Sequence, residues 1–153
     1  MLGVSVPATL FGSAPAEDRW SAAPSEVRVV DGDTLRLGQR VLRLEGLEAP
    51  TRGETCLDAS GRGFDCGAAA ADRLARLVTD RTVSCRLHGH DRFRRALGTC
   101  EAQGTDVNRA LVSGGWAVAS SDGLSGAEDA ARSSGLGFWT SGGTPPRGWL
   151  DRR

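Results

Sequence analysis

Acidic and basic residues that could hold a divalent cation and a phosphate group recur along the first two thirds of the chain. Asp31 and Asp33 stand in a DGDT segment, Glu48 follows, and Arg43 and Arg95 are the basic candidates. Carboxylate oxygens are hard ligands that suit calcium, and the planar guanidinium of arginine fits two phosphate oxygens. Aspartate beside glycine is also common turn chemistry, so the DGDT segment taken alone favours a plain turn, and only its combination with the other residues favours a site.

A second candidate region is the charged segment HGHDRFRR at residues 88–95. Arg92 and Arg94, with the arginine that follows, form either a solvated loop or a local phosphate-binding patch. His88 and His90 could contribute to a zinc or copper site only if further ligands joined them. The segment therefore predicts a polar loop with two open interpretations.

The chain as a whole sets the limits for these candidates. Its 153 residues fit one domain. Its 19 basic residues, all of them arginine, balance 19 acidic residues, so any nucleic-acid-binding surface must be a local patch. No apolar run approaches the roughly 20 residues that a membrane helix needs. We expect a monomer without a membrane span.

The four cysteines are an even number in a small domain, which fits two disulfides in an oxidising compartment. Zinc is the alternative, but the chain contains no C-x-x-C spacing. The cysteine content thus favours an exported protein.

The two ends of the chain have weaker patterns. Residues 1–16 are mildly apolar and end in a segment that resembles a signal-peptide cleavage site, but they lack a positive start. We expect residues 1–25 to be a degraded signal or a disordered arm, and residues 142–153 to be a loose tail. Trp20 and Trp149 lie in these arms, where they could contact a partner.

Between the arms, residues 26–141 read as one domain of short strands with three helices. Alternating apolar residues predict the strands, and alanine-rich or capped segments predict the helices. Residues 48–66 are expected to be a structured loop. The predicted strands are 27–30, 34–37, 40–47, 82–87 and 96–102, and the predicted helices are 67–79, 106–113 and 127–134. The order indicates an α+β, mainly β fold, a five-stranded OB-type Greek-key barrel with packed helices.

Five separated motifs now point to a family. They are VVDGDTLRL at 29–37, VLRLEGLEAP at 41–50, DRFRR at 91–95, VNRALVSGGWA at 107–117 and LGFW at 136–139. In content and order the chain resembles the staphylococcal-nuclease-like, or thermonuclease, domains over roughly residues 27 to 140.

The cysteines resemble those of the disulfide-bearing, exported bacterial members of that family. This likeness implies the pairs Cys56–Cys66 and Cys85–Cys100 and a periplasmic or secreted location. Cys85 and Cys100 are equally distant from the middle of Arg92-Phe93. A hairpin that turned there would place them opposite each other, close to disulfide reach.

The resemblance also implies an activity, the calcium-dependent hydrolysis of phosphodiester bonds in DNA and RNA. Asp33 and Glu48 match the residues that hold calcium, and Arg43 and Arg95 match the arginines that hold the phosphate. Such groups neutralise charge that develops on the phosphate oxygens, while a glutamate removes a proton from the attacking water. The neighbours of the second arginine that we expect to touch the substrate are Arg92, Phe93 and Arg94.

Several residues depart from the family pattern. Thr51 stands at the position of the glutamate base, and Glu54, three residues later, is a candidate substitute or else a solvated loop residue. Glu48 replaces the usual, shorter aspartate. Arg94 replaces a glycine, which could change the direction of the next arginine. Arg43 has neighbouring acids, so in the absence of substrate we expect an ion pair with Glu45 or Glu48.

Three functions follow from this balance of matches and departures. The first is a weak calcium-dependent endonuclease-like phosphodiesterase with an impaired general base. The second is a catalytically inactive nuclease-like domain that binds nucleic acid or a protein in the cell envelope. The third is a structural envelope subunit that has also lost the metal.

Overall fold

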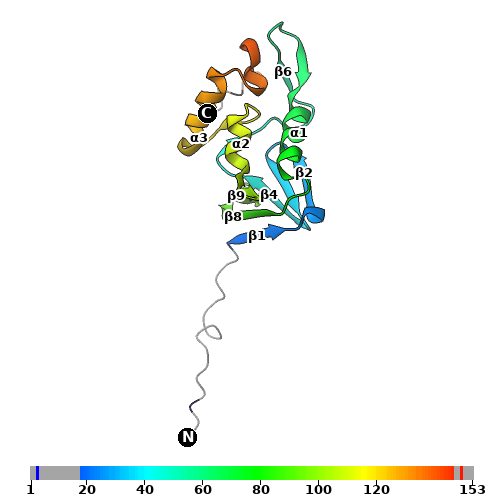
Figure 1. Cartoon of the computed structure of the whole chain (residues 1–153), viewed down its shortest axis with the longest axis vertical. Helices are drawn as coiled ribbons and strands as arrows, with labels where there is room; N and C mark the ends of the chain where they lie inside the picture. Colours follow the sequence, from blue (N-terminus) through cyan, green and yellow to red (C-terminus); the bar gives the residue numbers. More distant parts are fainter. Residues whose placement is uncertain (1–2, 4–17, 147–148, 150–153) are drawn as a thin grey trace.

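The structure, a computed structural model, describes residues 3, 18–146 and 149, and a mixed sheet carries most of its strands (Figure 1). Every pair in this sheet is antiparallel except β4 with β9, which is parallel. A short strand, β10 (Thr105–Asp106), adds to β9. In spatial order the sheet contains β1 (Arg19–Ala22), β8 (Val83–His90), β9 (Ala96–Ala102), β4 (Arg40–Leu44), β3 (Thr34–Leu37) and β2 (Val27–Asp31).

This topology confirms the predicted OB-type α+β fold, with all five expected strands in the sheet. The barrel is not closed among the described residues, because the sheet runs from β1 at one edge to β2 at the other. The inward side chains alternate as a half-buried sheet requires. In β9, for example, Ala96, Cys100 and Ala102 are buried, whereas Thr99 and Glu101 are exposed.

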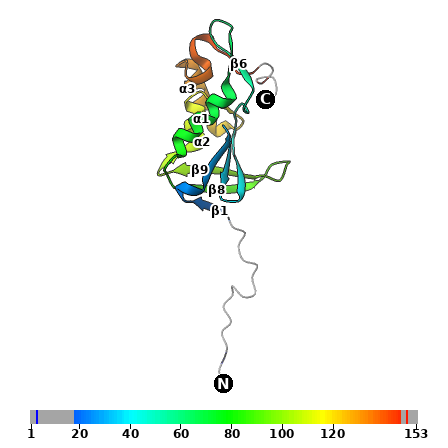
Figure 2. The ribbon, with the colours of Figure 1, turned by 90° about the vertical axis from the view of Figure 1, so that its right-hand side faces the viewer.

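Two helices cover the sheet, as Figure 2 shows from the side. Helix α1 (Cys66–Val78) begins at Asp65, whose carboxylate accepts a hydrogen bond from the Ala68 N–H at 2.8 Å. Helix α2 (Val107–Ser113) begins in the same way at Asp106. A short acceptor side chain at this position satisfies a backbone N–H that the helix leaves unpaired.

Helix α3 (Asp122–Ser133) begins five residues before the start that the sequence predicted at residue 127. Two glycines in its first turns lower the helix propensity of this segment, so the sequence did not predict a helix there. The burial of apolar side chains outweighs this low helix propensity. Leu124, Ala127 and Ala131 recur on one face of the helix and are buried.

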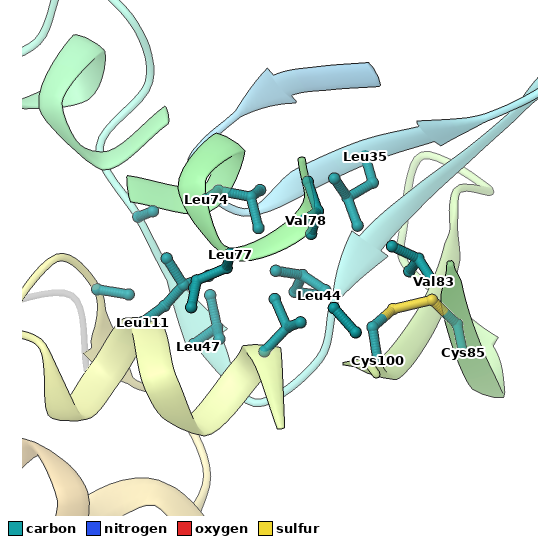
Figure 3. Packing of buried hydrophobic residues seen from close by; sticks show 14 of the residues in the cluster. Leu35, Leu44, Leu47, Leu74, Leu77, Val78, Val83, Cys85, Cys100 and Leu111 are labelled. Carbon is teal, nitrogen blue, oxygen red and sulfur yellow. A yellow bond between two sulfur atoms is a disulfide. The ribbon is translucent and has the colours of Figure 1, made fainter. Parts of the chain in front are cut away.

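The core lies between the sheet and the two covering helices. In Figure 3, Leu74 and Leu77 of α1 and Leu111 of α2 point toward Leu44 and Leu47. A second cluster of buried apolar residues surrounds the Cys56–Cys66 disulfide and includes three aromatic side chains, Phe138, Trp139 and Trp149.

The segment 48–66 is structured, as expected, but it contains strands of its own. Strand β5 (Leu47–Glu48) pairs with β11 (Val118–Ala119). Strands β6 (Thr55–Leu57) and β7 (Gly63–Asp65) form a hairpin that lies at the opposite end of the molecule from β1 (Figure 1). Both predicted disulfides are confirmed, one from Cys56 in β6 to Cys66 at the start of α1 and one between β8 and β9.

Both ends of the domain extend beyond the boundaries expected from the sequence. Residues 19–22 form β1, and a 3-10 helix, η2 (Pro24–Glu26), follows, so the fold begins before residue 26. After the 3-10 helix η3 (Gly137–Gly142), Thr144 forms a backbone bridge with Leu57. Residues 1–16, apart from Gly3, lie outside the described residues. None of the helices described here has the length and apolar character needed to cross a membrane.

Neither arm tryptophan is a free surface residue. Trp149 is 2% exposed and belongs to the second core cluster. Trp20 is partly buried against the main core, and the Arg40 guanidinium lies 4.4 Å from its ring centre. Trp149 is therefore a core residue and not a surface contact, whereas a partner contact of Trp20 stays a prediction.

One buried polar side chain connects three parts of the fold. Asn108 of α2 accepts a hydrogen bond from the Cys100 N–H at 3.0 Å, and its amide donates to the carbonyls of Glu45 and Gly98 at 2.9 and 3.1 Å. It therefore joins α2 and β9 to the turn that follows β4.

We expect Asn108→Ala to lower the free energy of unfolding by about 2–4 kcal/mol, because it leaves a buried N–H and two carbonyls without this partner. Urea denaturation followed by circular dichroism measures the change. Asn108 is 2% exposed. A loss of stability no greater than that of an exposed alanine substitution, such as Arg36→Ala on the outer face of β3, would contradict this role.

Candidate active site

The charged side chains singled out in the sequence meet in one hollow of about 230 Å³ at the rim of the sheet. Besides Thr51 and Trp149, which are treated below, its walls carry charged residues from β2, the β2–β3 turn, β4, β5, the loop after β5 and the β8–β9 hairpin. These are Asp31, Asp33, Arg43, Glu48, Glu54 and Arg95. The two acids and two arginines expected to form the site are therefore together.

Asp33 is the most buried of these acids, with 6% of its surface exposed. One carboxylate oxygen accepts a hydrogen bond from the Thr34 hydroxyl at 2.9 Å, and the other accepts from the Ala49 N–H at 3.1 Å. The Arg43 guanidinium lies 3.7 Å from that second oxygen. Arg43 therefore pairs with Asp33, and not with the acids closer to it in sequence.

The charges in the hollow suit a divalent cation. Four carboxylates and two guanidiniums line the hollow. Oxygen donors of this kind are the ligands that calcium prefers. Within residues 18–146, 149 and 3, no group of three or more His, Cys, Asp or Glu side chains forms a metal centre. Any cation here would depend on Asp33 and Glu48 together with substrate or solvent oxygens.

Thr51 and Glu54 occupy the ends of one tight turn. The Glu54 N–H donates to the Thr51 carbonyl at 3.0 Å, and Gly53 has a φ of 90°, which is typical of the third residue of a type II turn. This geometry brings the two side chains together, and the Thr51 hydroxyl donates to Glu54 Oε1 at 2.9 Å. The Glu54 carboxylate thus lies within one hydrogen bond of the residue that occupies the expected base position.

Neighbouring elements hold this turn from two sides. Asp31, at the end of β2, accepts a hydrogen bond from the Arg52 N–H at 3.0 Å. Asp65, which also caps α1, accepts from the Gly53 N–H at 3.1 Å. The turn is therefore tied to the sheet and to the start of a helix.

Gly67, in the first turn of α1, packs directly against the same turn. A Cβ added to Gly67 would overlap the carbonyl oxygen of Thr51 and the N–H of Arg52. Only glycine allows the helix to approach this closely, so the residue fixes the distance between α1 and the turn.

A third contact with Glu54 comes from the far end of the chain. The indole N–H of Trp149 donates to Glu54 Oε2 at 2.9 Å, and Trp149 also lines the hollow. Sequence reasoning missed this residue at the site. Trp149 lies 95 positions from Glu54 in a segment rich in glycine and proline, and nothing in that composition indicates a long-range contact.

The tip of the β8–β9 hairpin is organised by Asp91, another residue that the sequence reasoning left without a role. One of its oxygens accepts hydrogen bonds from the Phe93 and Arg95 N–H groups at 2.8 and 2.9 Å. The other accepts from the Arg95 Nε at 2.7 Å. The spacing from Asp91 to Arg95 was a usable signal, because an acid four residues before an arginine can form an ion pair across a tight turn.

Arg94 keeps the backbone conformation that a glycine would adopt, with a φ of 64°. A bulky residue in the left-handed region is strained, but the hydrogen bonds to Asp91 hold the turn. Arg95 consequently still faces the hollow.

The remaining residues of this hairpin stand outside the lining of the hollow. Phe93 is 62% exposed, and the guanidiniums of Arg92 and Arg95 lie 5.0 and 5.4 Å from its ring centre. Together they form an exposed patch of one aromatic ring and two cations beside the hollow. His88 lies 3.6 Å from Glu45, away from this patch.

The pKa of Asp91 is lowered below its ordinary value of 3.8. Removal from water acts in the opposite direction and would raise the pKa. The hydrogen bonds from the Arg95 backbone and side chain, with that from Phe93, outweigh it by stabilising the carboxylate.

Comparison with known proteins places the chain among relatives of one kind. Residues 41–141 match the family described as staphylococcal nuclease homologue. The chain is also 35% identical over 143 residues to the succinoglycan biosynthesis protein ExoI of Rhizobium meliloti (strain 1021), an alignment that covers 88% of this chain and 75% of that protein.

We expect Gly67→Ala to destabilise the protein by about 1–3 kcal/mol and to disturb the hollow, because the new methyl group must displace the Thr51 backbone. Thermal denaturation measures the first effect. The second should appear as shifted Thr51, Arg52 and Gly53 amide resonances in an NMR spectrum. Gly126→Ala in α3 is the control, since a Cβ there meets no atom within 4 Å. Equal effects of the two substitutions would contradict the close-approach argument.

A second prediction concerns pH. The folded-state pKa of Asp91 lies below its unfolded value, so its carboxylate stabilises the fold above the unfolded pKa, and this contribution is lost as the pH falls through the folded pKa. Arg95→Ala should raise the pKa of Asp91 part of the way toward 3.8, as measured by an NMR titration of the carboxyl carbon. The stability difference between the wild type and Asp91→Asn should shrink in the same acidic range. A pKa of Asp91 that does not move in Arg95→Ala would overturn the proposed cause.

Proposed function

The chain belongs to the staphylococcal nuclease homologue family, and from this membership we propose that it is a calcium-dependent phosphodiesterase acting on DNA or RNA, with Glu54 as its general base. One observation carries the proposal. The Glu54 carboxylate shares a hollow with Asp33, Arg43 and Arg95, and it is held there by the side chain of Thr51.

Two arginines bind the phosphodiester in this proposal. Arg43 comes from a central strand and Arg95 from the braced tip of the hairpin, so they reach the hollow from different elements. Their guanidiniums neutralise the negative charge that grows on the nonbridging oxygens as phosphorus becomes five-coordinate. Arg43 would then exchange part of its attraction to Asp33 for the phosphate.

The Glu54 carboxylate performs the proton transfer. A water molecule attacks phosphorus, its proton passes to Glu54, a new P–O bond forms, and one ester P–O bond breaks. The leaving alkoxide takes up a proton from solvent, and Glu54 then releases its own. A carboxylate has about four lone-pair positions. The hydroxyl and backbone N–H of Thr51 and the indole N–H of Trp149 use three of them, which leaves about one for water.

Asp33 and Glu48 are the residues that would hold calcium. When bound, this ion would supply positive charge beside the phosphate oxygens. The longer side chain of Glu48 suits a cation placed differently from the usual one, and a shift of about 1 Å can reduce the rate on the order of 10²-fold. We therefore propose a weak enzyme.

The patch at the hairpin tip would contact the bases of the substrate. Phe93 offers an exposed ring on which a base can stack, and Arg92 and Arg95 add positive charge beside it. The exposed Arg94 on the same hairpin would add a further positive charge. Contacts of this kind tolerate many sequences, so we propose little sequence preference. We further propose a periplasmic or secreted location, with which the two disulfides are compatible.

The second candidate is a nuclease-like domain that binds without cutting. Its supporting observation is Thr51 at the base position, combined with hydrogen bonds to both oxygens of Glu54. In that case Glu54 has a structural role, and the hollow only binds a cation and an anionic partner.

Cleavage of single-stranded DNA with calcium, compared with EDTA, separates the two candidates. We expect Glu54→Gln to reduce the cleavage rate by about 10²–10⁴-fold, the usual range for loss of a general base. Asp33→Ala serves as the inactive control.

A rescue variant sharpens this test. Thr51→Glu in the Glu54→Gln background places a carboxylate at the family's base position and should restore part of the lost activity. Wild-type cleavage that does not exceed the Asp33→Ala control, combined with measurable calcium binding by calorimetry, would establish the binding module instead.

A further inference from the structure

Trp149 occupies an unusual place for a residue so near the end of the chain. It lies in the second core cluster with the Cys56–Cys66 disulfide, and 2% of its surface is exposed. The backbone N–H of Trp149 donates to the carbonyl of Pro146 at 3.1 Å. Two backbone hydrogen bonds between Thr144 and Leu57 join the preceding residues to β6. The indole is therefore anchored by packing and by backbone contacts.

The polar edge of this anchored ring points at the proposed base. The Trp149 Nε1 donates to Glu54 Oε2, while the Thr51 hydroxyl donates to Glu54 Oε1, both at 2.9 Å. The Thr51 backbone N–H also donates to Oε1, at 3.5 Å. Both oxygens therefore accept hydrogen bonds, and the carboxylate is held from both sides. A single donor would leave it free to rotate about its last side-chain bond.

We propose that Trp149 is a positioning residue that fixes the orientation of the Glu54 carboxylate, so that the C-terminal segment completes the active site. This inference rests on the proposed role of Glu54 as base. The physical reason is that a general base acts only when its oxygen lies within hydrogen-bond reach of the attacking water. Thr51, which cannot itself act as the base, becomes the second positioning residue.

The chain offers a matched control for the substitution that tests this role. Trp139 belongs to the same core cluster and is similarly buried, but its indole N–H has no hydrogen-bond partner among the described residues. Replacement of either tryptophan by phenylalanine removes an indole from the same cluster. Only Trp149→Phe removes a donor from Glu54.

The first experiment compares the steady-state kinetics of the two variants on single-stranded DNA with calcium. We expect Trp149→Phe to lower kcat by about 10- to 100-fold with little change in KM, as a misplaced base does. Trp139→Phe should leave kcat unchanged once both are corrected for the folded fraction. In the Glu54→Gln background, Trp149→Phe should cause no further loss, because the group that it positions is already gone.

A second measurement does not depend on catalysis. The four tryptophans give four indole N–H resonances in an NMR spectrum. The Trp149 resonance should be the one that shifts most in Glu54→Gln, and its hydrogen exchange should accelerate in Glu54→Ala. The Trp139 resonance should change little in either variant.

Different failures have different meanings. If Glu54→Gln impairs cleavage but Trp149→Phe behaves like Trp139→Phe, the positioning role is wrong and the proposed function stands. An additional loss from Trp149→Phe in the Glu54→Gln background would also overturn it, since the tryptophan would then act on something else. If Glu54→Gln cuts as well as the wild type, Glu54 is not the base and the proposed function is wrong. A Trp149 resonance that does not shift in Glu54→Gln would show that the hydrogen bond between Trp149 and Glu54 does not form.

Discussion

The buried carboxylate of Asp33 is the constraint on which the site depends. A nearly inaccessible charge is costly unless hydrogen bonds and an opposite charge compensate for it. Here the compensation comes from the Ala49 backbone and the Arg43 guanidinium. The first belongs to the segment after β5, the second to β4, and Asp33 itself to the β2–β3 turn. Stabilising one charge therefore brings three parts of the chain to the same hollow.

The second requirement is a fixed turn at residues 51–54, which under the proposed function carries the base at Glu54 in place of a glutamate at position 51. Moving a carboxylate from position 51 to position 54 would ordinarily place it in a mobile loop. The turn prevents this, because its hydrogen bond brings the two ends together and the Thr51 side chain binds the displaced acid. Gly67 then sets how closely helix α1 approaches the turn.

Local sequence patterns predicted the parts of the structure that depend on neighbouring residues. The five main strands and the first two helices follow from alternation and caps, and symmetric spacing about a hairpin supports the Cys85–Cys100 disulfide. The Cys56–Cys66 pairing came from the family resemblance. Helix α3 began earlier than expected because burial of Leu124 outweighs two unfavourable glycines. Strand β1 lies in a segment that sequence reasoning treated as an arm, because its four residues are stabilised by pairing with β8 and by packing of Trp20 and Ala22 on the core, which are long-range contacts.

The candidate site likewise contains residues that the sequence predicted and residues that only long-range contacts bring there. The convergence of Asp33, Arg43, Glu48 and Arg95 was expected from family motifs, since these fix both residue type and spacing. Asp91 had a visible local signal that was not used. Trp149 had none, because a contact across 95 positions depends on how the final segment crosses β6.

The position of the Cys56–Cys66 disulfide connects these observations. Cys56 follows Glu54 by two residues, and Cys66 opens the helix whose next residue is Gly67. The disulfide thus links β6, which follows the turn at residues 51–54, to α1, which packs against that turn. Trp149 belongs to the same buried cluster as this disulfide. In the proposed mechanism, a base on this short turn needs support from other parts of the chain to keep a fixed orientation. The Cys56–Cys66 disulfide, the start of α1 and Trp149 supply that support, and all three act on one short turn.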